Sequence, residues 1–226
     1  MSLGKKFTYT GIGLMAAAIL FTVMVAGIDV RPIAPDGSLV GMGGLNIAFA
    51  EAFFSDVPGV YTINRVLYGI SEFGGILALV TAAAFGVLGV YQLIKRKKIF
   101  KVDYCVLSMG VLYVIVGILY VVFDKFAVNM RPVYEANGTL ESSFPSSHTL
   151  LACCIFVPGI FAIGRVIEDR RISFVLSTIM AFLAVVVVIC RLFCGVHWLT
   201  DMIGGLLYSA ALVSVYIGAN LIYEFK

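Results

Sequence analysis

Six stretches of apolar residues, each about 20 residues long or longer, dominate this sequence. A helix of about 20 residues spans the ~30 Å hydrocarbon core of a bilayer. With 61% hydrophobic and only 13% charged residues, the composition is far from that of a soluble domain. The sequence therefore predicts an all-α polytopic membrane protein. Its six transmembrane helices are expected at residues 7–28, 66–94, 102–123, 147–167, 172–193 and 201–223.

The length suits a single domain over residues 1–226. The first apolar stretch, 7–28, is longer than the core of a typical signal peptide, which predicts an uncleaved first span. The longest connection, 29–65, opens with turn residues, and its part from Leu45 to Phe54 is expected to form a short amphipathic helix at the membrane interface. An ordered loop without any role in substrate binding is the alternative, and the sequence does not indicate what this segment does.

Basic residues indicate the orientation. Eleven of the sixteen Lys and Arg residues fall on one side of the six spans, so the positive-inside rule predicts that this side, with both termini, is cytoplasmic in a multi-pass cell-membrane protein. The eleven are Lys5, Lys6, Lys95, Arg96, Lys97, Lys98, Lys101, Arg165, Arg170, Arg171 and Lys226.

Three polar clusters lie between residues 124 and 201, at span ends that this topology places on the other, extracytoplasmic side. The first runs from Lys125 to Arg131-Pro132, the second is Pro145-Ser146-Ser147-His148, and the third runs from Arg191 through His197 to Asp201. His148 and His197 are the only two histidines of the chain. Convergence of three distant segments at one membrane face predicts a functional site there.

Each cluster has chemistry that suits a phosphate group. The Pro145 cluster is typical of a helix start, where Ser146 or Ser147 could cap and unpaired N–H groups favour an anion. Arg131 and Arg191 carry forked donors that match phosphate oxygens. Simple helix capping, and arginines that reach toward lipid headgroups, are the alternatives for these residues taken singly.

The third cluster combines a histidine with a carboxylate. His197 and Asp201 are four residues apart, which puts them on one helical face if the last span begins early. A carboxylate that holds one ring nitrogen leaves the other free to attack. A His–Asp pair that merely closes a helix end is the alternative.

Together the clusters resemble the tripartite motif of the type 2 phosphatidic acid phosphatase superfamily, which also includes bacterial acid phosphatases and vanadium haloperoxidases. That motif consists of Lys, six residues and Arg-Pro, then Pro-Ser-Gly-His, then Ser-Arg, five residues, His, three residues and Asp. The resemblance implies a membrane-integral phosphatase that acts on a lipid phosphate or pyrophosphate at the outer leaflet.

The resemblance also implies individual roles. His197 would be the nucleophile that accepts the phosphoryl group, with Asp201 orienting it. His148 would protonate the leaving oxygen and then activate water against the phosphohistidine. The phosphate oxygens would be held by Lys125, Arg131 and Arg191, with the backbone N–H groups near Ser146 and Ser147.

Two residues of the later motifs depart from the family pattern. Ser147 replaces the glycine, which keeps its N–H available, and Cys190 replaces the serine before Arg191, which exchanges a hydroxyl donor for a weaker thiol.

The first motif departs further. Only five residues separate Lys125 from Arg131, so the family's lysine position is occupied by Asp124, an anion that would repel phosphate. On a regular helix, residues six apart lie roughly 120° from the same face, so Lys125 could serve only where the backbone is irregular or through its long stem.

Undecaprenyl pyrophosphate is the first substrate considered, followed by phosphatidylglycerophosphate and phosphatidic acid. Alternatives are a phosphotransferase that uses the same intermediate, a noncatalytic lipid-binding membrane protein, and a transporter in which Glu72 would be the intramembrane charge. The sequence does not decide the lipid, hydrolysis against transfer, or the oligomeric state.

No metal or other cofactor is expected, because the cationic groups would take the place of a metal. The five cysteines show no Cys-x-x-Cys or Cys/His ligand spacing, so they are interpreted as small apolar packing residues. The expected partners are the lipid phosphate substrate and the bilayer, and no nucleic acid.

Overall fold

The computed structural model describes residues 1–135 and 138–224. Of the described helices, six are long and apolar enough to cross a membrane, and they confirm the six predicted spans. They are α1 (Leu3–Gly27), α3 (Arg65–Arg96), α4 (Tyr104–Lys125), α5 (Ser147–Val166), α6 (Arg170–Phe193) and α7 (Leu199–Glu224). The shorter elements are β1 (Arg31–Pro32), β2 (Leu39–Val40), α2 (Gly43–Phe54) and a 3-10 turn, η1 (Ile99–Lys101).

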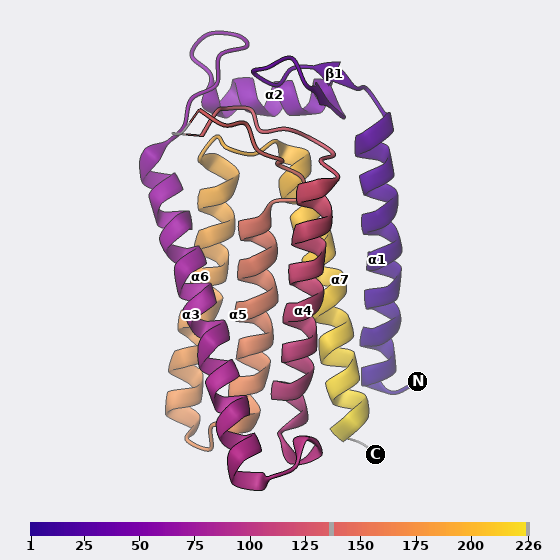
Figure 1. Ribbon diagram of the computed structural model, residues 1–226, viewed down its shortest axis with the longest axis vertical. Coiled ribbons are helices and arrows are strands. Elements are labelled where there is room, and N and C mark those ends of the chain that lie inside the picture. The colour runs from indigo at the N-terminus through magenta and orange to yellow at the C-terminus, as the bar shows by residue number, and fades with distance from the viewer. Residues whose placement is uncertain (136–137, 225–226) are drawn as a thin grey trace.

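The six long helices run side by side, and the start of α1 and the end of α7 lie at the same end of the bundle (Figure 1). The connections 28–64 and 194–198, and the described residues 126–135 and 138–146, lie at the opposite end, which we call the site end. In the most apolar window of α5 and of α7, 56% of the residues are buried, against 11–22% in the other four long helices. Thus α5 and α7 form the centre, and the remaining helices expose apolar side chains as a lipid-facing surface requires. Lys226, one of the basic residues used to predict the orientation, lies outside the described residues.

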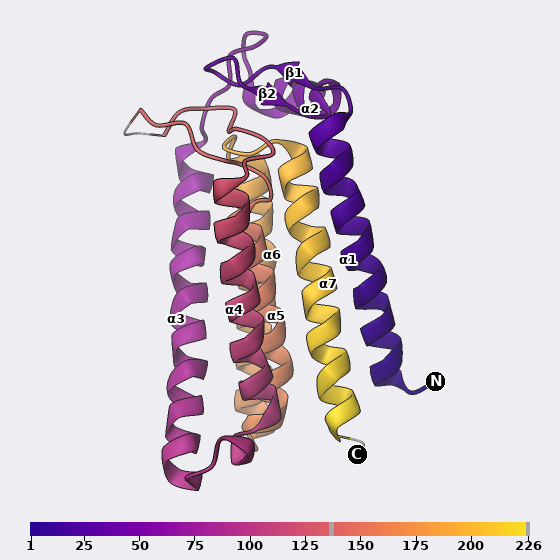
Figure 2. The ribbon, with the colours of Figure 1, turned by 45° about the vertical axis from the view of Figure 1, so that its right-hand side comes forward.

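Helices α1 and α7 pack closely along their length (Figure 2). At Gly11 an added Cβ would lie 2.8 Å from the carbonyl oxygen of Ala211, and at Gly4 it would lie 2.9 Å from the backbone nitrogen of Ile222. Small residues that let backbones approach are typical of membrane helix pairs, where packing rather than the hydrophobic effect drives association.

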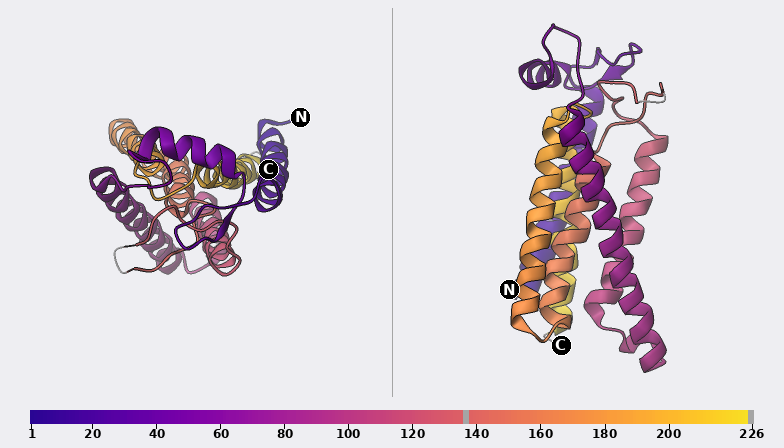
Figure 3. Two further views of the ribbon diagram at one scale, coloured as in Figure 1. Left: turned by 90° about the horizontal axis from the view of Figure 1, so that it is seen from above. Right: turned by 90° about the vertical axis from the view of Figure 1, so that its left-hand side faces the viewer.

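The predicted helix in the long connection is present as α2, which lies across the site end of the bundle (Figure 3, left). Its buried residues recur at helical spacing on one face, at Gly43, Asn46, Ala50 and Phe54. Asn46 is fully buried: its side-chain amide donates to the carbonyl of Gly41 at 2.9 Å and to the hydroxyl of Thr200 at 3.0 Å, and accepts from the Thr200 N–H at 3.1 Å. These bonds tie the connection to the first turn of α7, beside Asp201.

Candidate active site

The segment between α4 and α5 folds back on itself and presents Arg131. The Arg131 N–H donates to the carbonyl of Glu141 at 3.0 Å, and the Ser143 N–H donates to the carbonyl of Asn129 at 2.9 Å. Met130 and Ser142 form an isolated antiparallel bridge between these two pairs. The two arms of the segment therefore hold each other, and Arg131 is buried in spite of its position in a loop.

The second and third motifs are joined by a main-chain hydrogen bond. The Ser146 N–H donates to the carbonyl of Asp201 at 3.0 Å, immediately before α5 begins at Ser147. Ser146 occupies the N-cap position, but its side chain makes no capping bond. Because its N–H is already engaged, Ser146 does not offer that group to a phosphate, and the hydroxyl of Ser146 and the N–H and hydroxyl of Ser147 remain as candidate donors.

His197 lies in the short connection before α7. The prediction that His197 and Asp201 share one helical face needs the helix to begin by residue 197, but α7 begins at Leu199. The first turn of α7 nevertheless brings Asp201 Oδ2 to 3.6 Å from His197 Nδ1. Burial, with the nearby guanidinium groups of Arg191 and Arg131, lowers the pKa of the His197 imidazole well below its usual range. The ring is therefore neutral at neutral pH, the form in which a nitrogen lone pair is available for attack.

Asp201 is held from several directions. Its Oδ2 accepts the Trp198 N–H at 2.8 Å, and its Oδ1 accepts the Asn129 side-chain amide at 3.2 Å. The side-chain Oδ1 of Asn129 in turn accepts the Gly41 N–H at 2.9 Å, from the connection that carries α2. The indole of Trp198 donates to the carbonyl of Met130 at 2.7 Å, so the first and third motifs are linked as well.

The two arginines reach the site with carboxylate partners. Arg131 pairs with Glu135 and, at 3.0 Å, with Glu141. Arg191, in the last turn of α6 and 1% exposed, pairs with Glu72 of α3 at 2.8 Å. A guanidinium group has five donors, so each of these pairs leaves other donors unused.

Most buried polar atoms without a partner gather at this site. Among the described residues, seven buried side-chain nitrogen or oxygen atoms have no hydrogen-bond partner, and six of the seven belong to residues of the three motifs or to the segment between the first two. The six are Arg131 Nε, Ser143 Oγ, Ser146 Oγ, Arg191 Nε, His197 Nδ1 and His197 Nε2. A buried unpaired polar group costs about 1–3 kcal/mol, so this concentration indicates a place that a polar ligand completes.

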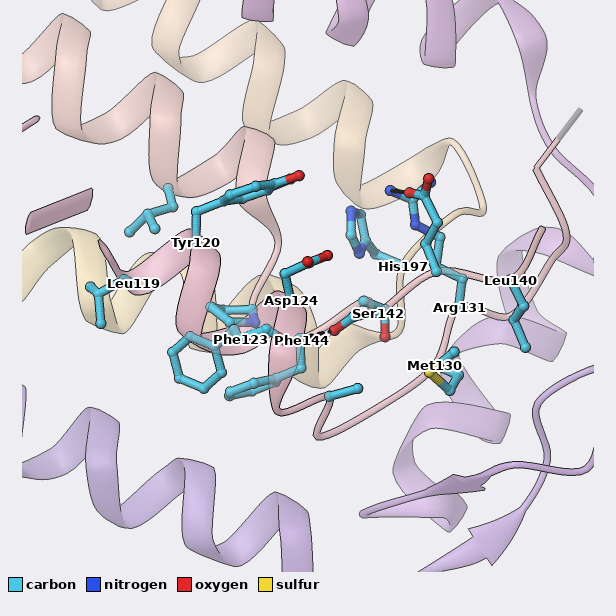
Figure 4. Close-up of a pocket in the computed structure, with 16 residues that line it drawn as sticks. Leu119, Tyr120, Phe123, Asp124, Met130, Arg131, Leu140, Ser142, Phe144 and His197 are labelled. Carbon is cyan, nitrogen blue, oxygen red and sulfur yellow. Dashed lines mark hydrogen bonds and ion pairs between the residues drawn. The ribbon is translucent and has the colours of Figure 1, made fainter. Parts of the chain in front are cut away.

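His197 and Arg131 line a cavity of about 340 Å³ between the α4 end and the 126–146 segment. Figure 4 shows their side chains beside each other at one end of the cavity, with Tyr120 and Asp124 from α4 along another side. Asp124 lines this cavity, whereas Lys125 does not: it is exposed at the end of α4 and has no hydrogen bond or ion pair within the described part of the chain. The regular helix up to Lys125 is the reason, because it turns neighbouring side chains about 100° apart.

Several residues that the motifs do not include take part in the site. Glu72 contacts both Arg191 and His148, and Asn46 and Asn129 fix the surroundings of Asp201. Of these, only Glu72 had a sequence signal, as a charge within a predicted span. Within residues 1–135 and 138–224, no group of three or more His, Cys, Asp or Glu side chains is arranged to hold a metal ion.

The geometry defines a class of protein: a six-span membrane protein with a cationic, histidine-containing pocket at one end of its bundle. The sequence model described as the PAP2 superfamily matches residues 102–220. The chain therefore belongs to the PAP2 superfamily, which confirms the predicted family, here in a member with six candidate membrane spans.

A solved structure has the same fold. It is described as the first transmembrane PAP2 type phosphatidylglycerolphosphate phosphatase from Bacillus subtilis. It superposes with a TM-score of 0.61 and 22% sequence identity, over 96% of this chain and 98% of that one. A comparison with the curated proteins finds no match.

Proposed function

We propose that this protein hydrolyses a lipid phosphate or pyrophosphate without a metal, through a phosphohistidine on His197. The observation that carries the proposal is the gathering of buried, unpartnered donors at this site, together with an imidazole on His197 whose two ring nitrogens also have no hydrogen-bond partner. A tetrahedral anion would accept hydrogen bonds from Arg131, Arg191 and Ser146, while the imidazole faces phosphorus. Positioning and charge stabilisation of this kind supply most of the catalysis in phosphoryl transfer.

The chemistry needs two steps. In the first, a ring nitrogen of His197 forms a bond to phosphorus, the bond from phosphorus to the leaving oxygen breaks, and His148 donates a proton to that oxygen. In the second, His148 takes a proton from water as the water oxygen attacks phosphorus and the P–N bond breaks. Asp201 stabilises the positive charge that develops on His197 in the first step.

An apolar cleft supports a lipid as the substrate. It has a volume of about 610 Å³, starts at Ser147 and His148, and continues between α3, α4 and α5 past residues such as Ile76, Leu79 and Val116. A hydrocarbon chain would lie in this cleft while the phosphate occupies the polar end. Figure 3 (right) shows α3 and α4, two of the helices that line the cleft, at one side of the bundle.

Among lipids, we propose undecaprenyl pyrophosphate first, with phosphatidylglycerophosphate and phosphatidic acid next. The B. subtilis protein of the same fold carries phosphatidylglycerolphosphate in its description, which supports the second choice. Phosphate release from all three, measured with purified protein in detergent and EDTA, tests the proposal. We expect turnover of at least one lipid that EDTA does not reduce; failure on every lipid phosphate, or loss of activity with EDTA, would contradict it.

Hydrolysis and transfer to a second lipid headgroup share the same intermediate. We propose hydrolysis, because no second headgroup is needed to complete the chemistry. Adding a diacylglycerol or prenol acceptor to the same assay distinguishes them: an acceptor-dependent rate would favour the phosphotransferase.

We further propose that the site end is extracytoplasmic and that the termini are cytoplasmic. The predicted distribution of basic residues supports this, with Arg165, Arg170 and Arg171 at the end opposite to the site. In intact cells, a membrane-impermeant thiol reagent should label a cysteine placed at exposed Asp36 and spare one placed at Arg170. The reverse labelling would invert the orientation.

A further inference from the structure

Helix α3 forms one wall of the site, although it lies outside the region matched by the family model and outside all three motifs. Ser71, Glu72 and Gly75 occupy neighbouring positions on α3, since residues three and four apart share a helical face. All three lie against His148 or Arg191. The site thus has a fourth component, contributed by the second span.

Glu72 connects two of the proposed functional residues. Its Oε1 accepts a hydrogen bond from Arg191 Nη1 at 2.8 Å and lies 3.1 Å from His148 Nε2. The hydroxyl of Ser71 also accepts from Arg191 Nη1, at 3.1 Å, and donates to the carbonyl of Tyr68 at 2.8 Å. The position of Arg191 is therefore set by α3, and the imidazole of His148 lies beside the same carboxylate.

Gly75 leaves space for the imidazole of His148 against α3. An added Cβ at this position would lie 2.9 Å from His148 Cδ2 and 3.1 Å from Nε2. The ring can lie against α3, within reach of Glu72, because residue 75 has no side chain. This is a second observation, independent of the ion pair, that α3 is shaped around His148.

Most of the influences on His148 disfavour a protonated ring, and Glu72 opposes them. Burial has the largest effect and disfavours a positive charge on the ring. Arg191 of α6 and Arg131 of the segment before α5 repel such a charge as well, and His197, from the connection before α7, lies near enough to interact with it. Glu72 of α3 attracts that charge. A general acid must carry a proton when the leaving oxygen departs, so a group that favours the imidazolium is needed here.

We propose that Glu72 is a positioning residue for His148, forming a second histidine–carboxylate pair beside that of His197 and Asp201. Its Oε1 accepts a hydrogen bond from the Nε2–H group, which fixes the ring and leaves Nδ1 to give a proton to the leaving oxygen and later to take one from water. This rests on the proposed role of His148.

The test compares Glu72→Gln and Glu72→Ala with the unchanged full-length protein in detergent, on a short-chain lipid phosphate. We expect kcat to fall by about 10- to 100-fold in Glu72→Ala and by less in Glu72→Gln, which keeps an acceptor oxygen, while KM changes less than about threefold. Without the carboxylate the imidazolium is less stable, so the basic limb of the pH profile of kcat should move to lower pH. Glu224→Gln, which removes the partner of Arg165 at the opposite end of the bundle, is the matched control and should retain kcat.

A second substrate separates proton delivery from structural damage. p-Nitrophenyl phosphate has a leaving oxygen that needs little protonation, so the burst of p-nitrophenolate, which reports phosphorylation of His197, should be nearly as fast in Glu72→Ala as in the unchanged protein. The later steady-state rate, which needs His148 as the base, should stay reduced. Gly75→Ala is the second variant: its methyl group displaces the ring while Glu72 stays in place, and it should lose kcat on the lipid phosphate with the same preserved burst.

Two results would overturn the inference. An unchanged kcat with tighter inhibition by orthovanadate would mean that Glu72 only competes with the anion for Arg191. A burst on p-nitrophenyl phosphate that is slowed as much as kcat on the lipid phosphate, with an unshifted pH profile, would mean that Glu72 has a purely structural role. Both differ from failure of the proposed function, in which the unchanged protein would hydrolyse no lipid phosphate.

Discussion

His197→Ala should lower turnover of a lipid phosphate on the order of 10⁵-fold, because it removes the nitrogen that we propose forms the bond to phosphorus. The residual rate would come from substrate binding and charge stabilisation by the arginines. His148→Ala should also slow turnover, but by removing the proton donor and the base rather than the nucleophile. The two variants are therefore expected to be blocked at different steps of the reaction.

Radioactive phosphate in the substrate separates these steps. With a phosphoryl donor whose leaving group needs no protonation, His148→Ala should accumulate label on the protein, because the phosphohistidine forms and water attacks it slowly. His197→Ala should carry no label. The bound label should be lost in acid and survive in alkali, as an N-linked phosphate does.

The control for both variants is the thermal unfolding midpoint in detergent, since His197 is only 2% exposed and its truncation leaves a larger cavity. Labelled His197→Ala protein would refute the assignment of the nucleophile, and so would full activity of that variant.

Arg131→Lys and Arg191→Lys should each cost about 2–4 kcal/mol of transition-state stabilisation, although the charge is retained. This corresponds to a loss in kcat/KM of about 30- to 1,000-fold. The reason is geometric: Arg191 uses Nη1 for Ser71 and Glu72, so a lysine that kept those contacts would have nothing to replace the unpaired Nε. The same holds for Arg131, whose terminal nitrogens pair with Glu135 and Glu141.

Arg165→Lys is the matched control. Arg165 also pairs with a carboxylate, Glu224, but at the opposite end of the bundle, so kcat/KM should remain within about twofold of the unchanged protein. If Arg131→Lys and Arg191→Lys behaved like this control, neither guanidinium would hold the phosphate. Measurements at several lipid concentrations would show whether the loss lies in kcat or in KM.

The spans could be predicted from the sequence because hydropathy and length are local properties. The six predicted ranges differ from the helices by at most four residues at any end. The alignment of the polar clusters at one end followed from the alternation of spans, and the structure brings His148, His197, Asp201, Arg131 and Arg191 together there. These residues carry recognisable spacing, so they needed no knowledge of side-chain contacts.

The roles of Asn46 and Asn129 could not be predicted from the sequence, because they depend on hydrogen bonds between distant residues. Asn46 reaches Thr200 across 154 residues, and Asn129 reaches Asp201 across 72. An asparagine in a loop has no local signature of such a bond. Glu72 stood out as a charge in an apolar stretch, but only the packing of α3 against α5 and α6 turns it into a partner of His148 and Arg191. The one-residue offset of Lys125 was visible, and its consequence required knowing that α4 stays regular to its last turn.

The hydrogen bond from the Ser146 N–H to the Asp201 carbonyl uses main-chain atoms alone. This bond therefore does not depend on the side chains at residues 146, 147 and 201. Proline at 146 is the exception, because it has no N–H to donate. Substitutions can therefore change the side chains of this pocket, as at Ser147 and Cys190, while the main-chain bond still aligns the second and third motifs. Because the backbone alignment does not depend on the side chains that would contact the substrate, a bundle of this kind can acquire a preference for a different lipid headgroup.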